Sequence, residues 1–150
     1  MRDYLEAIRS RVVVFDGGMG ATLEQFDLTP EDYGGLPGKC HEALVLHRPD
    51  VIEGVHASMI EAGAEVVETD SFQGSRLKLE EWGLGEHTLE INRRAAEIAR
   101  RAAGEHRFVA GSIGPTGHLP ASEGSAGCGG VRGPGPSAAL DGQPRIATSA

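Results

Sequence analysis

Three short apolar runs punctuate the chain, and each is rich in β-branched residues. They occupy residues 11–16, 64–70 and 107–112, and each ends in a small or polar group. Runs of this length and composition are typical of strands that are buried on both faces of a parallel sheet. We therefore expect three parallel strands, with helices between them on one side of an open sheet.

Two longer segments carry apolar side chains at helical spacing. Residues 49–63 begin with a proline, which the first turn of a helix tolerates, and end at Gly63, which suits a C-terminal cap. Residues 88–104 repeat this design, with Thr88 as the expected N-cap and Gly104 at the end. Strand, helix, strand, helix, strand in this order predicts right-handed crossovers and an α/β fold.

Residues 27–48 lack this regularity. They contain three glycines and two prolines and connect the first strand to the first long helix. Long connections inside a compact domain are usually either functional or disordered. We expect this segment to form an excursion over one end of the sheet.

The composition changes sharply near residue 124. Residues 124–150 are rich in Gly, Pro, Ala and Ser, contain no aromatic residue and show no hydrophobic period. Such a segment cannot bury enough apolar surface to offset its ordering entropy. The sequence therefore predicts a folded part over 1–123 and a disordered tail over 124–150. The abrupt change also favours a frame-shifted or otherwise aberrant reading of a truncated gene over a native continuation. A natural flexible linker, which would have much the same composition, is the alternative.

Charge and hydropathy narrow the possible partners. The net charge is −8 and the chain has only two lysines, which disfavours nucleic acid as a partner. No apolar run approaches the roughly 18 residues of a membrane span, and the charged N-terminus does not resemble a signal peptide. We expect a cytoplasmic protein with no membrane partner.

The most distinctive chemistry lies where the predicted strands end. Asp16, Gly17 and Gly18 follow the first run, residues 69–72 follow the second, and residues 111–117 follow the third. Because ligands of parallel α/β folds bind outside the carboxyl ends of the strands, the three ends predict a single site.

Simpler interpretations of these motifs remain open. A dinucleotide fingerprint would need a glycine where Leu23 stands, which disfavours that cofactor. A turn in which Gly17 or Gly18 has positive φ and Asp16 caps the next helix would also explain the first motif. The six histidines form no pair at helical spacing and are expected on the solvated surface.

The three strand ends, taken together, resemble one known family. The stretches "FDGGMGATL", "CHEALVLHRPDVIEGVHASMIEAGAEVVETDSF" and "VAGSIGPTG" are similar to the start of the homocysteine S-methyltransferase family, and within it to the cobalamin-dependent members. The resemblance covers about residues 5–123. It implies that the chain is the N-terminal part, about three βα units, of a (β/α)₈ TIM barrel, because a whole barrel takes about 250 residues.

The resemblance also implies a homocysteine pocket. It places Asp16, Gly17 and Gly18 in that pocket after the first strand, and Thr69, Ser71 and Phe72 after the second. Backbone N–H groups beside glycines can meet a carboxylate, and an aspartate can meet an ammonium. Two positions depart from the pattern, since the family commonly has Asn where Asp70 and His41 stand.

The resemblance implies a zinc ion held by three cysteines on late parts of the barrel. Neither Cys40 nor Cys128 lies in such a context, so we assign no metal ligand and expect this chain to bind neither zinc nor cobalamin.

The implied function is methyl transfer from methylcobalamin to homocysteine, giving methionine, with cobalamin- and folate-binding modules in a full-length parent. The chain alone is expected to be inactive. The alternatives are a fragment of a betaine- or S-methylmethionine-dependent homocysteine methyltransferase and a non-enzymatic binding module.

Overall fold

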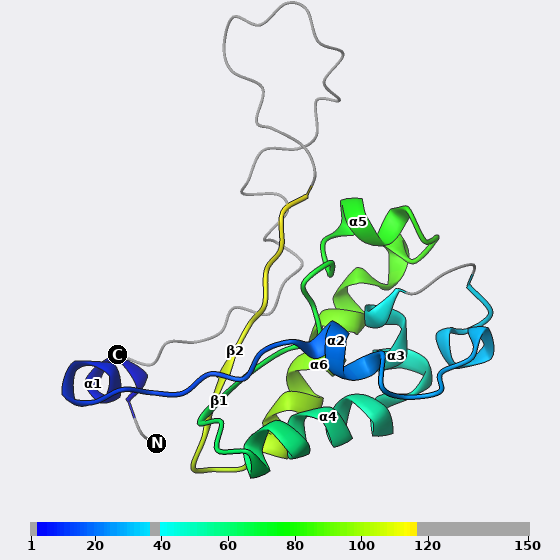
Figure 1. The fold of residues 1–150 in the computed structure, drawn as a ribbon. Coiled ribbons are helices and arrows are strands. Elements are labelled where there is room, and N and C mark those ends of the chain that lie inside the picture. The colour runs from blue at the N-terminus through cyan, green and yellow to red at the C-terminus, as the bar shows by residue number, and fades with distance from the viewer. Residues whose placement is uncertain (1–2, 37–39, 117–150) are drawn as a thin grey trace, which may run out of the picture.

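A computed structural model describes residues 3–36 and 40–116. Its sheet consists of two parallel strands, β1 (Val66–Glu68) and β2 (Phe108–Ala110), in register with Val66 opposite Phe108. Residues 14–16 run along the other edge of β1, where a single parallel bridge joins Phe15 to Val66. The three predicted strands therefore lie side by side in chain order, although the first is reduced to this one bridge (Figure 1).

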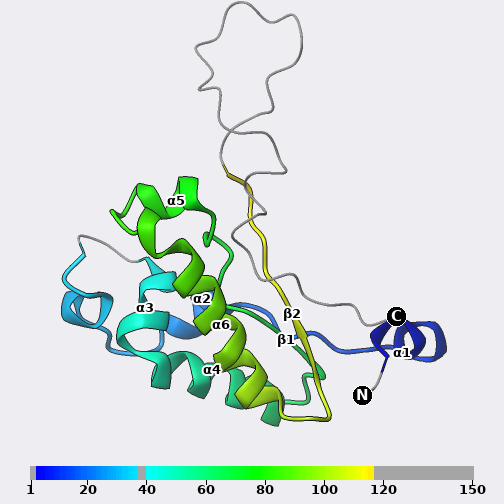
Figure 2. The same ribbon diagram turned by 180° about the vertical axis from the view of Figure 1, so that it is seen from behind.

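The two long helices cover one face of this sheet. α4 (Pro49–Glu61) and α6 (Thr88–Ala103) pack against each other (Figure 2). Val67 of β1 contacts Ala99 and Ala103 of α6. Both helices end close to the predicted residues, at glycines with positive φ. The expected N-cap of α6 is wrong: Thr88 is the first helical residue, and its hydroxyl donates to the carbonyl of Gly85 at 2.6 Å.

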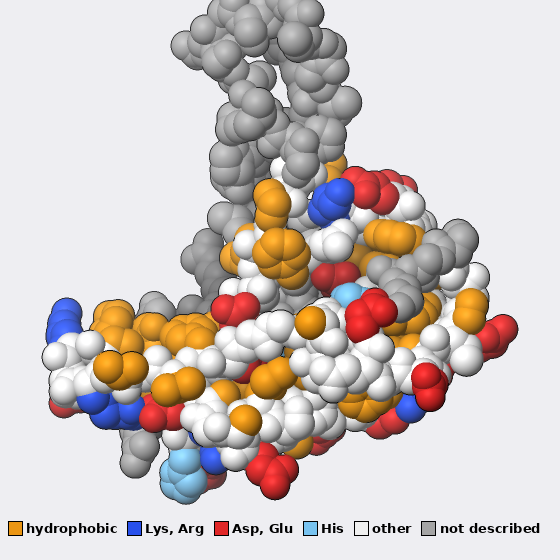
Figure 3. Space-filling view, in the orientation of Figure 1, with side chains coloured by type: hydrophobic (Ala, Val, Ile, Leu, Met, Phe, Trp, Pro, Cys, Tyr) orange, Lys and Arg blue, Asp and Glu red, His pale blue; other side chains and the backbone are white. Residues whose placement is uncertain are grey.

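The opposite face of the sheet is more open. The ring of Tyr4, in α1 (Tyr4–Ser10), makes edge-on contacts with Phe15 and Phe108 on this face. The prediction that the helices lie on one side of the sheet is therefore confirmed for the long helices α4 and α6 but not for α1. The first strand is not buried on both faces, since Val12 is 85% exposed and Val14 is also exposed. Figure 3 shows the exposed hydrophobic side chains of α1 and the segment that follows it.

The predicted excursion over residues 27–48 is instead part of the core. It contains the 3₁₀ helix η1 (Pro30–Tyr33) and the helix α3 (His41–His47). The side chains of Tyr33, Leu44 and Val45 are buried in the main hydrophobic cluster with residues of α4 and α6. The apolar run in α3 buries enough surface to fold the segment despite the glycines before it.

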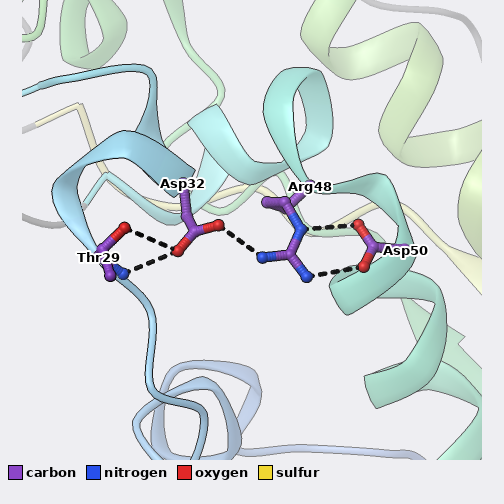
Figure 4. Close-up of polar contacts among 4 residues, drawn as sticks. All are labelled: Thr29, Asp32, Arg48 and Asp50. Atoms are coloured by element: carbon purple, nitrogen blue, oxygen red, sulfur yellow. Dashed lines mark hydrogen bonds and ion pairs between the residues drawn. The ribbon is translucent and has the colours of Figure 1, made fainter.

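A polar network anchors η1 to the start of α4 (Figure 4). The Asp32 carboxylate accepts hydrogen bonds from the backbone and hydroxyl of Thr29, at 2.8 and 3.0 Å. Arg48 bridges this carboxylate to that of Asp50, which it meets with two nitrogens at 3.0 and 2.8 Å. These contacts lower the pKa of both aspartates: the Thr29 backbone and then Arg48 act on Asp32, and Arg48 acts on Asp50.

Three short elements complete the described part: α2 (Met19–Leu23), α5 (Arg76–Glu80) and the 3₁₀ helix η2 (Gly85–His87). Within residues 3–36 and 40–116, no helix has the length and apolar character needed to cross a membrane. The predicted tail, 124–150, lies outside the described residues.

Candidate functional site

A pocket lies where the three parallel segments end. Asp16 comes from the first segment, Thr69 and Asp70 follow β1, and Ser112 follows β2. Of the six predicted site residues, five line this pocket: Asp16, Gly17, Gly18, Thr69 and Phe72. Ser71 does not line it but contacts residues that do.

Asp16 is held in place by the end of β1. Both of its carboxylate oxygens accept from the backbone N–H of Glu68, at 3.0 and 3.1 Å. The side chain is 6% exposed, and this burial raises the pKa of the carboxyl. The hydrogen bond from Glu68 lowers that pKa, whereas the charge of Glu68 raises it. A cation in the pocket would relieve the crowding of negative charge.

The turn after Asp16 depends on one glycine. Gly18 has a φ of +67° and precedes the first residue of α2, a conformation that other residues rarely adopt. The structure gives Gly18, not Asp16, as the N-cap of α2. Asp16 is therefore directed to Glu68 and is not used as a helix cap.

Hydroxyl groups tie the ends of β1 and β2 together. Ser71 Oγ donates to the carbonyl of Ser112 at 2.9 Å, so Thr69 Oγ1 donates to Ser71 Oγ at 2.7 Å. Thr69 Oγ1 in turn accepts from the backbone N–H of Ser112 at 3.0 Å. Because both hydroxyl protons are used within the protein, Thr69 and Ser71 shape the pocket through these bonds.

Phe72 forms an exposed edge of the pocket. Its side chain is 56% exposed, and its carbonyl accepts from the backbone N–H of Gly114 at 2.8 Å. A Cβ at Gly114 would overlap this carbonyl oxygen. The glycine therefore allows the chain after β2 to pass close to Phe72.

A buried acidic group lies behind the β1 end, and the sequence analysis missed it. Glu42 of α3 accepts from the backbone N–H of Gln73 at 2.6 Å and lies 3.7 Å from the Cys40 sulfur. Burial and then the charge of Glu42 raise the pKa of Cys40 to about 12 and that of Asp70 to about 8. The only sign of this buried site in the sequence was Glu42 itself, a single acidic residue in the apolar run of α3.

His56 contradicts the prediction that the histidines lie on the surface. It is 0% exposed, and burial lowers its pKa to about 4. It follows Ile52 by four residues and Val55 by one, so it lies on the inner face of α4. The helical spacing of its apolar neighbours was the signal that would have placed it there.

The described residues do not fit a zinc site. Among residues 3–36 and 40–116, no three His, Cys, Asp or Glu side chains are arranged to hold a metal ion. We therefore attribute no step of any reaction to a metal bound by these residues.

Comparisons with known proteins agree on one family. The sequence pattern of the family described as Homocysteine S-methyltransferase matches residues 13–139. The chain is 40% identical over 124 residues to methionine synthase of Mycobacterium tuberculosis and to that of Mycobacterium leprae. These matches cover 79% of the chain but only 10% of each relative.

Solved structures give the same result. The homocysteine methyltransferase MmuM from Escherichia coli is 26% identical in both its oxidized and its metallated forms, with TM-scores of 0.59 and 0.57. The matches cover 75% and 72% of the chain, and 41% and 40% of the MmuM chains. The chain belongs to the homocysteine S-methyltransferase family.

Proposed function

We propose that the pocket binds the amino-acid group of homocysteine and that this chain is part of a homocysteine S-methyltransferase. The observation that carries the proposal is the charge of the pocket. The carboxylates of Asp16 and Glu68 line it, together with the carboxyl of Asp70, whose pKa is raised to about 8, and no Lys, Arg or His is among its described lining residues. Such a lining favours a ligand with an ammonium group.

The remaining lining suits the rest of the ligand. Met19, Val55, Met59 and Phe72 contribute apolar surface beside the carboxylates. A short alkyl chain ending in sulfur would lie against this surface, while the ammonium lies at Asp16. The Glu68 N–H holds the Asp16 carboxylate in one orientation, and the Thr69, Ser71 and Ser112 bonds fix the wall beside it.

The proposed reaction gives methionine. The homocysteine thiol releases its proton to solvent, and its sulfur then forms a bond to the methyl carbon. The bond between methyl and donor breaks with its electron pair left on the donor. The matches to proteins named methionine synthase support methionine as the product. The family resemblance implies methylcobalamin as the donor, with zinc and with cobalamin- and folate-binding modules in a full-length parent. A betaine or S-methylmethionine donor is the second candidate, and the match to a protein named homocysteine methyltransferase is compatible with either donor.

Titration calorimetry with L-homocysteine tests the proposed ligand. We expect saturable binding to the chain and at least tenfold weaker binding to Asp16→Asn, since one hydrogen-bonded charge pair is worth at least about 1.4 kcal/mol. Asp27→Asn, which alters an exposed carboxylate outside the pocket, is the matched control and should bind like the wild type. An absence of binding, or equal losses in both variants, would contradict the proposal.

We also propose that residues 124–150 are a frame-shifted or otherwise aberrant reading of the gene. The support is the loss of hydrophobic periodicity together with the Gly, Ala, Pro and Ser content. Translating the other two frames of the nucleotide sequence from codon 124 should restore a strand-and-helix pattern. Early stops in both frames would show that the tail is genuine, an outcome compatible with the family match to residue 139.

A further inference from the structure

His56 is buried beside the proposed ligand pocket, and its ring nitrogens make no hydrogen bond to the described residues. Its side chain is 0% exposed. Leaving a buried donor or acceptor unpaired costs about 1–3 kcal/mol, so such a group requires an explanation. A residue that only filled the core would be replaced by an apolar one without this cost.

The nearest acidic oxygen belongs to Asp16. His56 Nδ1 lies 4.0 Å from Asp16 Oδ2. Both oxygens of that carboxylate share one N–H donor, from Glu68, whereas an ionised carboxylate can accept about four hydrogen bonds. An unpaired imidazole nitrogen therefore lies 4.0 Å from a carboxylate oxygen that can accept a further hydrogen bond.

The charge state of His56 suits a donor role. Burial lowers its pKa to about 4, against a smaller opposing effect of Glu53, so the ring is neutral at pH 7 and carries one N–H. A proton on Nδ1 points a donor at Asp16. The gap is about 1 Å longer than a hydrogen bond, and hydrogen bonds of functional sites often tighten only when the ligand is bound.

We propose that His56 is a positioning residue for Asp16, whose Nδ1–H closes onto Oδ2 when an ammonium ligand enters the pocket. The inference rests on the proposed function, because it assigns the ligand's ammonium to the same carboxylate. His56 comes from α4, which also supplies the lining residues Val55 and Met59. A small shift of this helix would therefore move the imidazole and the pocket wall together.

Two substitutions separate positioning from packing. His56→Asn keeps an N–H near the place of Nδ1, whereas His56→Leu keeps much of the volume without a donor. We expect His56→Leu to bind L-homocysteine about tenfold more weakly in calorimetry, and His56→Asn to stay within about threefold of the wild type. Circular dichroism and thermal melting check the fold of each variant. Wild-type affinity in folded His56→Leu, or equal losses in both folded variants, would overturn the proposal.

A second measurement needs no variant. Long-range ¹H–¹⁵N NMR of the wild-type chain reports which ring nitrogen of His56 is protonated. We expect the Nδ1–H tautomer in the free chain and a downfield shift of that proton when L-homocysteine is added. An Nε2–H tautomer would overturn the role of His56 whether or not homocysteine binds. Failure of homocysteine binding alone would instead remove the proposed function.

Discussion

Ile52→Ala is expected to lower the free energy of unfolding by about 3–4 kcal/mol, as is usual for truncating a fully buried aliphatic side chain. Ile52 is completely buried in the cluster that joins α2, η1, α3, α4 and α6. The alanine would leave a cavity where these elements meet. Urea unfolding followed by circular dichroism measures the loss, and Ile52→Val, with an expected loss of about 1 kcal/mol, keeps the test useful if the alanine variant does not fold.

Val12→Ala is the matched control. Val12 belongs to an apolar run that was predicted to be buried, but its side chain is 85% exposed. Its truncation should therefore change the free energy of unfolding by less than about 0.5 kcal/mol. Comparable losses at both positions would show that the exposed face of the first segment is covered in solution. That outcome would contradict the one-sided packing of helices on the sheet.

The regular elements were the predictable part of the fold. β1 and β2 lie inside the predicted runs, and α4 and α6 end within two residues of the predicted limits, because burial and helical spacing leave a direct trace in the sequence. α3 was missed because the glycines and prolines before it dominate the pattern. Its burial depends on contacts with α4 and with α6. The local composition of residues 27–48 gives no sign of these contacts, and α6 is also distant in sequence.

The sequence predicted where the candidate site lies but not the buried residues that surround it. Strand-end chemistry brought Asp16, Gly17 and Gly18 to the same pocket as Thr69 and Phe72, as expected from parallel topology. The residues behind them could not be found in this way. Glu42 and His56 lie inside helices, and their proximity to the strand ends arises only when α3 and α4 pack.

Asp70 is the part of this network with the clearest consequence for stability. It is buried, one of its carboxyl oxygens has no hydrogen-bond partner among the described residues, and the family resemblance places Asn at its position. A protonated carboxyl has nearly the same shape as an amide and, like it, offers both a donor and an acceptor. Burial raises the pKa of Asp70 most, and the charge of Glu42 raises it further. The neighbouring Cys40, with a pKa of about 12, stays protonated and adds no charge. We therefore expect Asp70 to be protonated in the native chain at pH 7.

Protonation of Asp70 makes the stability fall as pH rises. Its pKa increases from 3.8 in the unfolded chain to about 8 in the native one, so between these values the native state holds a proton that the unfolded state releases. The stabilisation is complete below pH 4 and is lost as pH rises through 8. Because one pKa unit is worth about 1.4 kcal/mol, the stability of the wild type relative to Asp70→Asn should fall by roughly 4 kcal/mol between pH 5 and pH 8, and Asp70→Asn should be the more stable chain at pH 9. Urea unfolding at pH 5, 7 and 9 measures this difference, with Asp27→Asn expected to follow the wild type. Parallel pH profiles for wild type and Asp70→Asn would mean that the pKa of Asp70 is not raised in the native chain, and would overturn this prediction.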